Sequence, residues 1–442
     1  MADDGQPARA AVAHPLIPRQ RGDFSLADLP PAPQRRRRRG PLLLAVLALV
    51  AVVALVAGRD MLATAVRPAV ARPPTPLEAA RASLKQQSAA LLSGDSAGWL
   101  AAVAPSLRSR YEAMFASLRS LGVSRFDYDL LASGDSFDVI NARARIHYCL
   151  TGTTCTAATA PVLEHRVTLK PVAGRWVIAA SSTERSEDDF QPPPWDEGGL
   201  VFAQGKRVTL AALPAQKKHF ASVLPIADAA ALVNDKFATL VGNPQQRYRV
   251  YLAGAKQWKS WYGGIDDKWV VGYAVPLGEA GMDVVLNMDA LSKDRRLLET
   301  TVQHELGHVV TIGTLHRRDW GSGDMWLKEG IAEYIGWYPE PATASWRRGS
   351  VHDLVTGDNP PTSIATKAMA TDARQEEGDS FYGLGHFAAA CLAEKYGQRA
   401  LFTFVRLYLR EEKDLDPASE AAFGRPFATV DKTCVAWIRD NA

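Results

Sequence analysis

Cysteine is scarce in this chain, which has four among 442 residues. That number is too small for a disulfide scaffold of the kind that supports small secreted domains. Charge of one sign is also lacking, because 51 Lys and Arg face 48 Asp and Glu and leave a net charge of +3. Five of the positive charges form one run, Arg35 to Arg39, and the rest of the chain is slightly acidic. This balance argues against nucleic acid as a partner.

The arginine run is followed directly by a long uncharged apolar run, Pro41 to Ala57. Roughly 17 apolar residues is near the shortest helix that crosses a bilayer, and an arginine block marks the preceding side as cytoplasmic. We therefore predict a single-pass transmembrane helix over 41–58, with a cytoplasmic N-terminus and an extracellular remainder anchored in the cell membrane. The alternative is a secretory signal with a long basic region, cleaved after Ala63-Thr64-Ala65.

Composition divides the rest of the chain into folded units and connections. Residues 1–40 have few large apolar side chains, which predicts a disordered basic tail. Residues 59–76 are rich in proline, which predicts an extended linker. Residues 183–199 are acidic and then proline-rich, which predicts a boundary. Two folded units remain, 77–182 and 200–442, in agreement with the two or three domains that this length favours.

The unit 77–182 is predicted to be α+β. Helical patterns cover Leu77–Ser93 and Ala97–Leu121, and strand patterns cover Phe126–Ala132, Phe137–Leu150 and Pro161–Ala180. Helices followed by an antiparallel meander that ends in Gly174-Arg-Trp resemble the nuclear-transport-factor-like cone fold. Domains of that fold include both enzymes and binding modules, so the resemblance implies an architecture and no activity.

The four cysteines are placed as two possible pairs. Cys149 and Cys155 bracket a turn-like stretch and can close a hairpin, and Cys391 and Cys434 can tie the end of the chain to an earlier helix. Two disulfides fit an oxidising compartment. The alternative is four unpaired cysteines that pack as small apolar side chains.

The unit 200–442 is predicted to begin with a small sheet and to become mostly helical after Ser292. Strands are predicted at Val201, Val208, Tyr248–Leu252 and Val284–Asn287, and one or two helices in Pro214–Leu240. The overall fold class expected for the two units is therefore α+β.

A helix is predicted over 297–311 because apolar residues recur there at steps of three and four. They are Leu297, Leu298, Val302, Leu306, Val309 and Val310. Within this helix stands His304-Glu-Leu-Gly-His308, and residues four apart lie on one face of a helix. His304 and His308 are therefore expected to present two imidazoles to one zinc ion, with Glu305 within reach of a water on that ion.

A catalytic zinc takes three protein ligands and a water, so one ligand is still to be found. The pattern H-E-x-x-H-x-x-G-x-x-H is excluded, because Thr311 and Thr314 stand where its glycine and third histidine belong. Further along, Asp324 is placed to cap a new helix. On that helix Glu329 and Glu333 are four apart and share a face, and the spacing alone leaves either of them as the ligand.

His304-Glu-Leu-Gly-His308 followed by Trp326-Leu-Lys-Glu-Gly-Ile-Ala332 resembles the gluzincins, the thermolysin-like and aminopeptidase-like zinc peptidases. The resemblance implies a gluzincin-like catalytic domain, zinc as cofactor and a peptide or protein as substrate. It implies Glu329 as the third metal ligand and Glu333 as the acid that orients His304, with Glu333 as the reserve ligand. The spacer from His308 to Glu329 is a little longer than in the aminopeptidases.

A further segment, Phe381-Tyr-Gly-Leu-Gly-His-Phe387, is predicted to begin a helix that runs to Gly397. Many gluzincins carry Tyr-x-x-Gly in this place, and the tyrosine hydroxyl or a nearby histidine donates to the oxyanion. The resemblance implies that role for Tyr382, with Gly385 as the glycine, and makes His386 the second candidate. Core packing is the alternative for both side chains.

These residues together predict a membrane-anchored extracellular zinc peptidase. Glu305 is expected to take a proton from a zinc-bound water and pass it to the leaving nitrogen. The strand Val284–Asn287 is the predicted edge along which an extended peptide adds. Endopeptidase activity is preferred, because the G-x-M-E-N motif of the aminopeptidases is absent. The alternatives are an anchored extracellular binding or regulatory protein with an inactive peptidase-like domain, and a zinc hydrolase that acts on another kind of bond.

Overall fold

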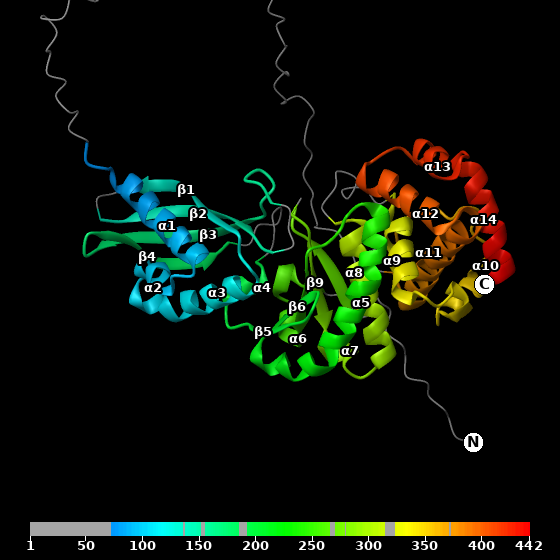
Figure 1. Cartoon of the computed structure of the whole chain (residues 1–442), viewed down its shortest axis with the longest axis horizontal. Helices are drawn as coiled ribbons and strands as arrows, with labels where there is room; N and C mark the ends of the chain where they lie inside the picture. Colours follow the sequence, from blue (N-terminus) through cyan, green and yellow to red (C-terminus); the bar gives the residue numbers. More distant parts are fainter. Residues whose placement is uncertain are drawn as a thin grey trace, which may run out of the picture. The chain divides into compact units, whose positions relative to one another are not determined.

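The computed structural model describes residues 72–442 with short gaps (Figure 1). The gaps are 136–137, 152–154, 185–191, 266–269, 279, 314–322 and 371–372. Residues Pro76–Ala442 fall in one compact unit, and its described part contains a four-stranded and a five-stranded sheet. The α+β class predicted from the sequence is confirmed.

The membrane part of the predicted fold class and the predicted localisation are corrected. In the described part of the chain no helix is long and apolar enough to cross a membrane. The predicted spanning segment 41–58, the tail 1–40 and the linker as far as residue 71 lie outside the described residues. We therefore do not retain a single-pass protein with a cytoplasmic N-terminus and an extracellular catalytic domain.

The first sheet and its helices are built from residues 76–183. The helices are α1 (Pro76–Ser93), α2 (Ser96–Ala101), η1 (Pro105–Leu107) and α3 (Arg108–Ser120), and the strands are β1 (Arg125–Asp135), β2 (Ile140–Cys149), β3 (Val162–Val172) and β4 (Arg175–Thr183). The strands pair antiparallel in chain order. Ala173 and Gly174 join β3 to β4 with positive φ at both residues, as the tightest hairpin turns require.

The core of this part lies between the helices and one face of the sheet. Buried and exposed residues alternate along β2, so the sheet has one apolar face. Trp99 of α2 packs on it, 5.6 Å from Phe126 between ring centroids. Trp195 of the short helix α4 (Pro194–Glu197) lies 4.8 Å from Tyr148 and is fully buried. Part of the predicted boundary 183–199 is thus packed into this core, and the domain limits 77–182 and 200–442 stay predictions.

Asp196, next to Trp195, is the centre of a buried polar network. Its carboxylate lies 2.8 Å from His165 Nε2 and 3.3 Å from Arg110 Nη2, and it accepts a hydrogen bond from Thr183 Oγ1. Burial alone would raise the pKa of Asp196, but the His165 imidazole and these hydrogen bonds outweigh burial and lower the pKa. The network ties α4 to the last two strands of the sheet.

Replacing Asp196 by asparagine is expected to destabilise the fold by about 3–5 kcal/mol at pH 7, because it breaks a buried ionic network. A carboxyl whose pKa is lowered in the folded state stabilises above its unfolded pKa, and this stabilisation is lost as the pH falls through the folded pKa. The difference between the variant and the parent chain should therefore shrink below about pH 4. Urea unfolding at pH 7 and below pH 4 measures the free energy of unfolding of the variant and of the parent chain, with the exposed Asp127→Asn as the control. An equal loss of stability at the two pH values would contradict the network.

Both predicted disulfides are present. Cys149 is bonded to Cys155 and Cys391 to Cys434. The first closes the loop after β2, and the second joins α11 (Gln375–Tyr396) to α14 (Phe427–Asn441). The alternative of four unpaired cysteines is excluded.

The second sheet has the strand order β5-β6-β7-β9-β8. Its strands are β5 (Val201–Gln204), β6 (Val208–Ala212), β7 (Tyr248–Ala253), β8 (Gly272–Pro276) and β9 (Met282–Asn287). The three inner strands are parallel, and β5 and β8 pair antiparallel at the two edges. The prediction that Val284–Asn287 is an edge strand is therefore wrong, because β9 is an inner strand. The edge is β8, a strand that the sequence did not lead us to predict.

The two faces of this sheet pack on different partners. Alternate residues such as Leu210, Val250 and Val284 join the core with the helices of 200–442, whereas Ala211, Tyr251 and Val285 join the core with residues of the first sheet. A strand buried on both faces is largely apolar, which is why these strands show little alternation in sequence. The charged exceptions, Arg249 of β7 and Asp283 of β9, form a buried ion pair.

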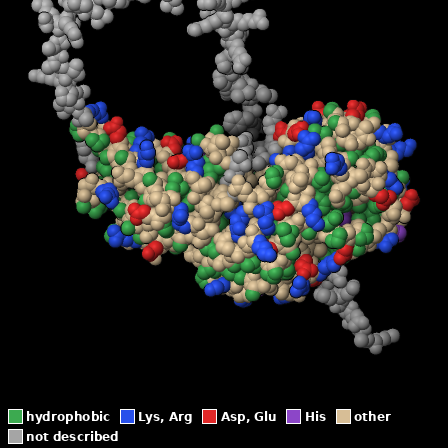
Figure 2. All heavy atoms as spheres, in the orientation of Figure 1, with side chains coloured by type: hydrophobic (Ala, Val, Ile, Leu, Met, Phe, Trp, Pro, Cys, Tyr) green, Lys and Arg blue, Asp and Glu red, His purple; other side chains and the backbone are tan. Residues whose placement is uncertain are grey.

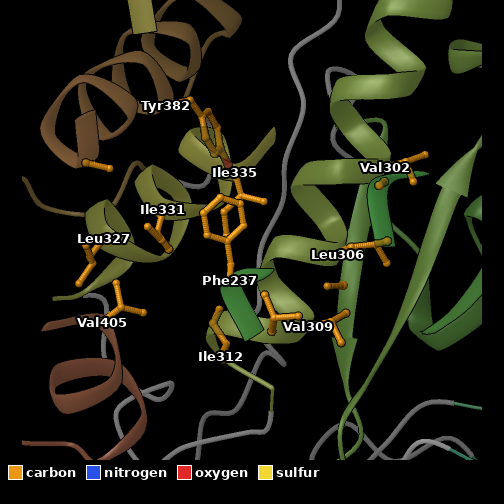
Figure 3. Close-up of a cluster of buried hydrophobic side chains, with 14 of the residues drawn as sticks. Phe237, Val302, Leu306, Val309, Ile312, Leu327, Ile331, Ile335, Tyr382 and Val405 are labelled. Carbon is orange, nitrogen blue, oxygen red and sulfur yellow. The ribbon is translucent and has the colours of Figure 1, made fainter. Parts of the chain in front are cut away.

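The remaining helices lie between the strands of this sheet and after them in the chain, and α6 and η3 add Trp258 and Trp261 to the core shared with the first sheet. They are η2 (Pro214–His219), α5 (Phe220–Val241), α6 (Ala255–Trp258), η3 (Trp261–Gly263), α7 (Met288–Leu291), α8 (Arg295–Thr311), α9 (Met325–Trp337), η5 (Ala342–Ala344), α10 (Arg348–Thr356), α11, α12 (Gln398–Val405), η6 (Arg406–Arg410), α13 (Leu415–Phe423) and α14. Figure 3 shows Phe237 of α5 between apolar residues of α8 and of α9. On the face seen in Figure 2, side chains of both charges are interspersed.

Candidate active site

The helix α8 carries the HELGH segment and is held at both ends. At its start the Asp294 side chain accepts a hydrogen bond from the Leu297 amide at 3.0 Å, the usual N-cap contact. At its end the Asn243 amide donates to two carbonyls of the last turn at 2.9 and 3.1 Å, and Arg410 donates to the Ile312 carbonyl at 2.7 Å. These contacts satisfy backbone groups that a helix end leaves without partners.

Every residue of α8 from Thr300 to Thr311 is buried except Gln303. Val302, Leu306 and Val309 face the sheet and α5 (Figure 3), and the two histidines lie on the opposite side of the helix. His304 and His308 place their Nε2 atoms 3.1 Å apart, with each residue 1% exposed.

Glu329 of α9 reaches the same point from the other side. Its Oε2 lies 3.4 Å from His304 Nε2 and 3.3 Å from His308 Nε2. In the described part of the chain, these three residues are the group of His, Cys, Asp and Glu side chains arranged so that they could hold one metal ion. The structure thus brings together the three side chains that the sequence reading put forward as ligands.

Glu333, one turn further along α9, faces the other nitrogen of His304. Its Oε1 lies 3.1 Å from His304 Nδ1, so it lies behind the imidazole rather than at the point where the three Nε2 and Oε2 atoms meet. A carboxylate in this place fixes the ring orientation and the tautomer of a ligand histidine. This is the position that the sequence reading gave to Glu333 first, and it does not favour Glu333 as the reserve ligand.

Two glycines allow α9 to approach α11 closely. A methyl group on Gly330 would lie 2.5 Å from the Gly385 carbonyl oxygen, and one on Gly385 would lie 2.9 Å from the Gly330 Cα. The crossing places Glu329 and Glu333 of α9 next to Tyr382 of α11. The Tyr-x-x-Gly pattern therefore has a structural reason here, because its glycine, Gly385, makes room for the close approach of α9.

Gly330→Ala is expected to force the two helices apart, because the added methyl group meets backbone atoms that cannot move alone. Overpacking of this kind costs about 1–3 kcal/mol and shifts the backbone, so both the free energy of unfolding and zinc affinity should fall. Chemical unfolding and zinc titration measure the two effects. The control is Gly349→Ala in α10, where a methyl group meets nothing within 4 Å and a stabilisation of up to about 1 kcal/mol is expected. A Gly330→Ala protein as stable as its parent would contradict the close crossing.

Glu305 lies beside the ligand group and is fully buried. Neither of its carboxylate oxygens has a hydrogen-bond partner among the described residues. Burial raises the pKa of Glu305 to about 8, with the His304 charge opposing the rise and Glu329 adding to it. Gly272 of β8 makes this position possible, since a methyl group there would lie 2.9 Å from Glu305 Oε1.

The electrostatics of the group favour a bound cation. Burial would raise the pKa of Glu329, but the two imidazoles outweigh it and hold the pKa well below its usual range. The carboxylate is therefore charged and fully buried, its oxygens make no hydrogen bond among the described residues, and only the two imidazoles lie close enough to balance its charge. A buried charge of this kind is strongly unfavourable unless an opposite charge compensates it. Two imidazole nitrogens and one carboxylate oxygen are a donor set of catalytic zinc, so the residues present fit this ion.

Tyr382 and His386 differ in their place relative to this group. The Tyr382 ring is buried 6.4 Å from the His304 ring between centroids, and burial together with the Glu329 charge raises the pKa of its hydroxyl well above the usual value. His386 lies one turn on, 6.3 Å from the Trp337 ring, and burial lowers its pKa to about 4. Its Nδ1 has no hydrogen-bond partner among the described residues. Tyr382 therefore adjoins His304, while His386 packs against Trp337 of α9.

The sequence reading missed the strand that lies over Glu305. The segment Val270-Val-Gly-Tyr-Ala-Val275 carries the signal, since β-branched and aromatic residues form a short apolar run there. It also missed Asn243 and Arg410, which hold the end of α8. No local pattern distinguishes these two residues from other surface polar residues, because their partners lie far away in sequence.

Comparisons with known proteins give a distant likeness and no family. No family model matches the chain, and no curated protein matches it. A protein of unknown function from Mycobacterium tuberculosis is 22% identical over 24% of this chain and 69% of its own, with a TM-score of 0.18. Native yeast LTA4 hydrolase is 13% identical over 66% of this chain and 54% of its own, with a TM-score of 0.32. This chain thus spans about half the length of the yeast hydrolase. TM-scores this low establish no shared fold, and the candidate function rests on the site geometry.

Proposed function

We propose that this protein is a zinc-dependent peptidase in which His304, His308 and Glu329 hold the metal. The supporting observation is the buried His–His–Glu group, whose nitrogen and oxygen atoms lie 3.1 to 3.4 Å apart, with the Glu305 carboxylate beside it on α8, the helix of the two histidines. When bound, zinc supplies a Lewis acid that polarises a carbonyl and lowers the pKa of water.

Glu305 is the general base of the proposed reaction. Its carboxylate accepts a proton from the attacking water, whose oxygen adds to the peptide carbonyl carbon, and then delivers that proton to the leaving nitrogen as the C–N bond breaks. The absence of a hydrogen-bond partner among the described residues leaves both carboxylate oxygens free for this proton transfer. Burial raises the pKa of Glu305, so its ionised form is a stronger base than a solvent-exposed carboxylate.

Tyr382 is the proposed donor to the carbonyl oxygen as negative charge develops on it. Burial keeps its hydroxyl protonated, since its pKa is raised well above the usual value, and a neutral O–H donor is what an oxyanion requires. Glu333 holds His304 in position through the 3.1 Å contact to Nδ1. His386 takes no part in the proposed proton transfers.

The substrate proposed is an extended peptide bound along β8. This strand is the edge of the five-stranded sheet on the side of β9, and its Gly272 lies against Glu305. An added peptide strand would therefore lie close to the general base, and main-chain hydrogen bonds would align its carbonyl groups. Such binding is independent of a chain terminus, which favours an endopeptidase.

The test is zinc content together with hydrolysis of a casein-like substrate, with and without a chelator. We expect about one zinc per chain, hydrolysis that stops when the chelator removes the metal, and recovery when zinc is added back. Zinc bound without any peptide hydrolysis would support the binding or regulatory protein, and hydrolysis of esters alone would support a hydrolase of another class. A chain that binds no zinc would overturn the proposal.

A further inference from the structure

Arg347 is a charged residue in the interior that the proposed reaction does not use. It stands just before α10, and its side chain is fully buried. The guanidinium Nη1 donates to Glu333 Oε2 at 2.9 Å, and Nε donates to Asp379 Oδ1 at 3.1 Å. Arg347 thus holds the carboxylate that in turn faces His304.

Burying a guanidinium is costly unless opposite charges and hydrogen bonds surround it. Arg347 meets that requirement with two carboxylates on two different helices, Glu333 on α9 and Asp379 on α11. The contact with Arg347 uses the Oε2 atom of Glu333. The Oε1 atom that remains on Glu333 is thereby free to accept from His304 Nδ1.

The same guanidinium lies over the ring of Tyr382, with 5.5 Å between the guanidinium carbon and the ring centroid. The guanidinium carbon also lies 5.4 Å from the centroid of the Trp346 ring. Asp379 is three residues before Tyr382 on α11, so both belong to one face of that helix. A methyl group on Gly383 would lie 3.1 Å from the Arg347 Cβ, which shows how closely α11 approaches this residue.

These contacts join two parts of the site that the chain separates widely. One series of contacts leads from Arg347 through Glu333 to His304 of α8. The other runs from Arg347 to the ring of Tyr382 and to the turn of α11 that carries it. The guanidinium of Arg347 is planar and donates on two sides, so it can hold Glu333 and the Tyr382 turn of α11 at the same time. A lysine supplies only a single point charge on a flexible stem.

We propose that Arg347 is a positioning residue that sets His304, through Glu333, and Tyr382, by direct stacking, in the relative geometry that zinc binding and oxyanion stabilisation require. This inference rests on the proposed function and deepens it. The effect of Arg347 passes through two other side chains, Glu333 and Tyr382.

The test compares Arg347→Lys and Arg347→Met with Arg348→Lys and Arg348→Met in the full-length chain. Arg348 is the adjacent residue and is exposed, so the control variants carry the same chemical changes one position away. Circular dichroism and thermal unfolding report the fold. Zinc affinity is measured by competition with a chelating dye, metal geometry by the visible spectrum of the Co²⁺-loaded protein, and kcat and KM with a labelled peptide.

We expect folded Arg347→Lys to bind zinc about 10- to 100-fold more weakly, the loss typical when a group behind a metal ligand is changed. Its cobalt spectrum should differ from that of the parent chain, and kcat should fall by at least as much as zinc affinity while KM changes little. Both Arg348 variants should keep the cobalt spectrum of the parent and stay within about twofold of it in zinc affinity, kcat and KM. A role in stability alone would lower the unfolding temperature and leave the cobalt spectrum and kcat of the folded protein unchanged.

A folded Arg347→Lys protein with the zinc affinity, cobalt spectrum and kcat of the parent would overturn this inference and leave the proposed function standing. A parent chain that binds no zinc would overturn both. Should Arg347→Met fail to fold, Asp379→Asn provides the second variant, because Asp379 is partly exposed and lies on α11, the helix that carries Tyr382. It is expected to lower kcat and keep the parent zinc affinity, and an unchanged kcat would count against the inference.

Discussion

Replacing Glu305 by glutamine is expected to abolish peptide hydrolysis while zinc stays bound. The amide has nearly the shape of the carboxylate but cannot accept the proton of the attacking water. General base catalysis contributes about 10²- to 10⁴-fold, so kcat should fall by that factor or more. Zinc affinity should change little, because Glu305 lies beside the His–His–Glu group and is not one of its members. Steady-state kinetics on a labelled peptide and metal analysis of the same sample measure both quantities.

The matched control for this variant is Glu299→Gln, on the same helix. The Glu299 side chain is 41% exposed and pairs with Arg295 at the surface, where an ion pair contributes little. Its activity should equal that of the parent chain. Retention of most activity by Glu305→Gln would assign the base to another residue and would contradict the proposed proton path.

The second large effect is expected for Glu329→Gln, which should lose zinc. Structural zinc sites bind with about 10–16 kcal/mol over four ligands, so one ligand corresponds to roughly 3 kcal/mol, or about 10²-fold in Kd. The neutral amide is also a poorer zinc ligand than a carboxylate. Activity should fall with metal occupancy and recover in part at high zinc concentration. Competition with a chelating dye measures the affinity directly.

Glu333→Gln distinguishes ligation from orientation, because Glu333 was the reserve ligand. It contacts His304 Nδ1, and a group in such a place is worth about 10- to 100-fold in affinity or activity. Glu329→Gln should therefore weaken zinc binding more than Glu333→Gln does. The reverse order would exchange the two roles and would require α9 to present its next turn to the metal.

The metal-facing part of the site could be predicted from the sequence because local geometry determines it. Four-residue spacing on a helix brings His304 and His308 together wherever that helix lies, and the same spacing brings Glu329 and Glu333 onto one face of α9. The disulfide between Cys149 and Cys155 was predictable for a similar reason, because the two cysteines are six residues apart and enclose a turn.

What the sequence could not provide are contacts between residues distant in the chain. Arg347 precedes α10, whereas its partners Glu333 and Asp379 lie on α9 and α11, so no spacing rule connects the three residues. The order of strands in the second sheet is also a long-range property: β9 follows β8 in the chain but lies inside it. Without that order, the sequence could not show that Val284–Asn287 is an inner strand and that β8 is the edge. The membrane prediction depended on one apolar run next to five arginines, and no described helix supports it.

The most direct test of the central claim is to locate the metal in crystals of the zinc-loaded protein. Anomalous scattering measured on both sides of the zinc absorption edge should give one peak about 2.0–2.2 Å from His304 Nε2, His308 Nε2 and a Glu329 carboxylate oxygen. No peak at that point, or a zinc ion bound elsewhere in the chain with these three side chains left without metal, would contradict the account.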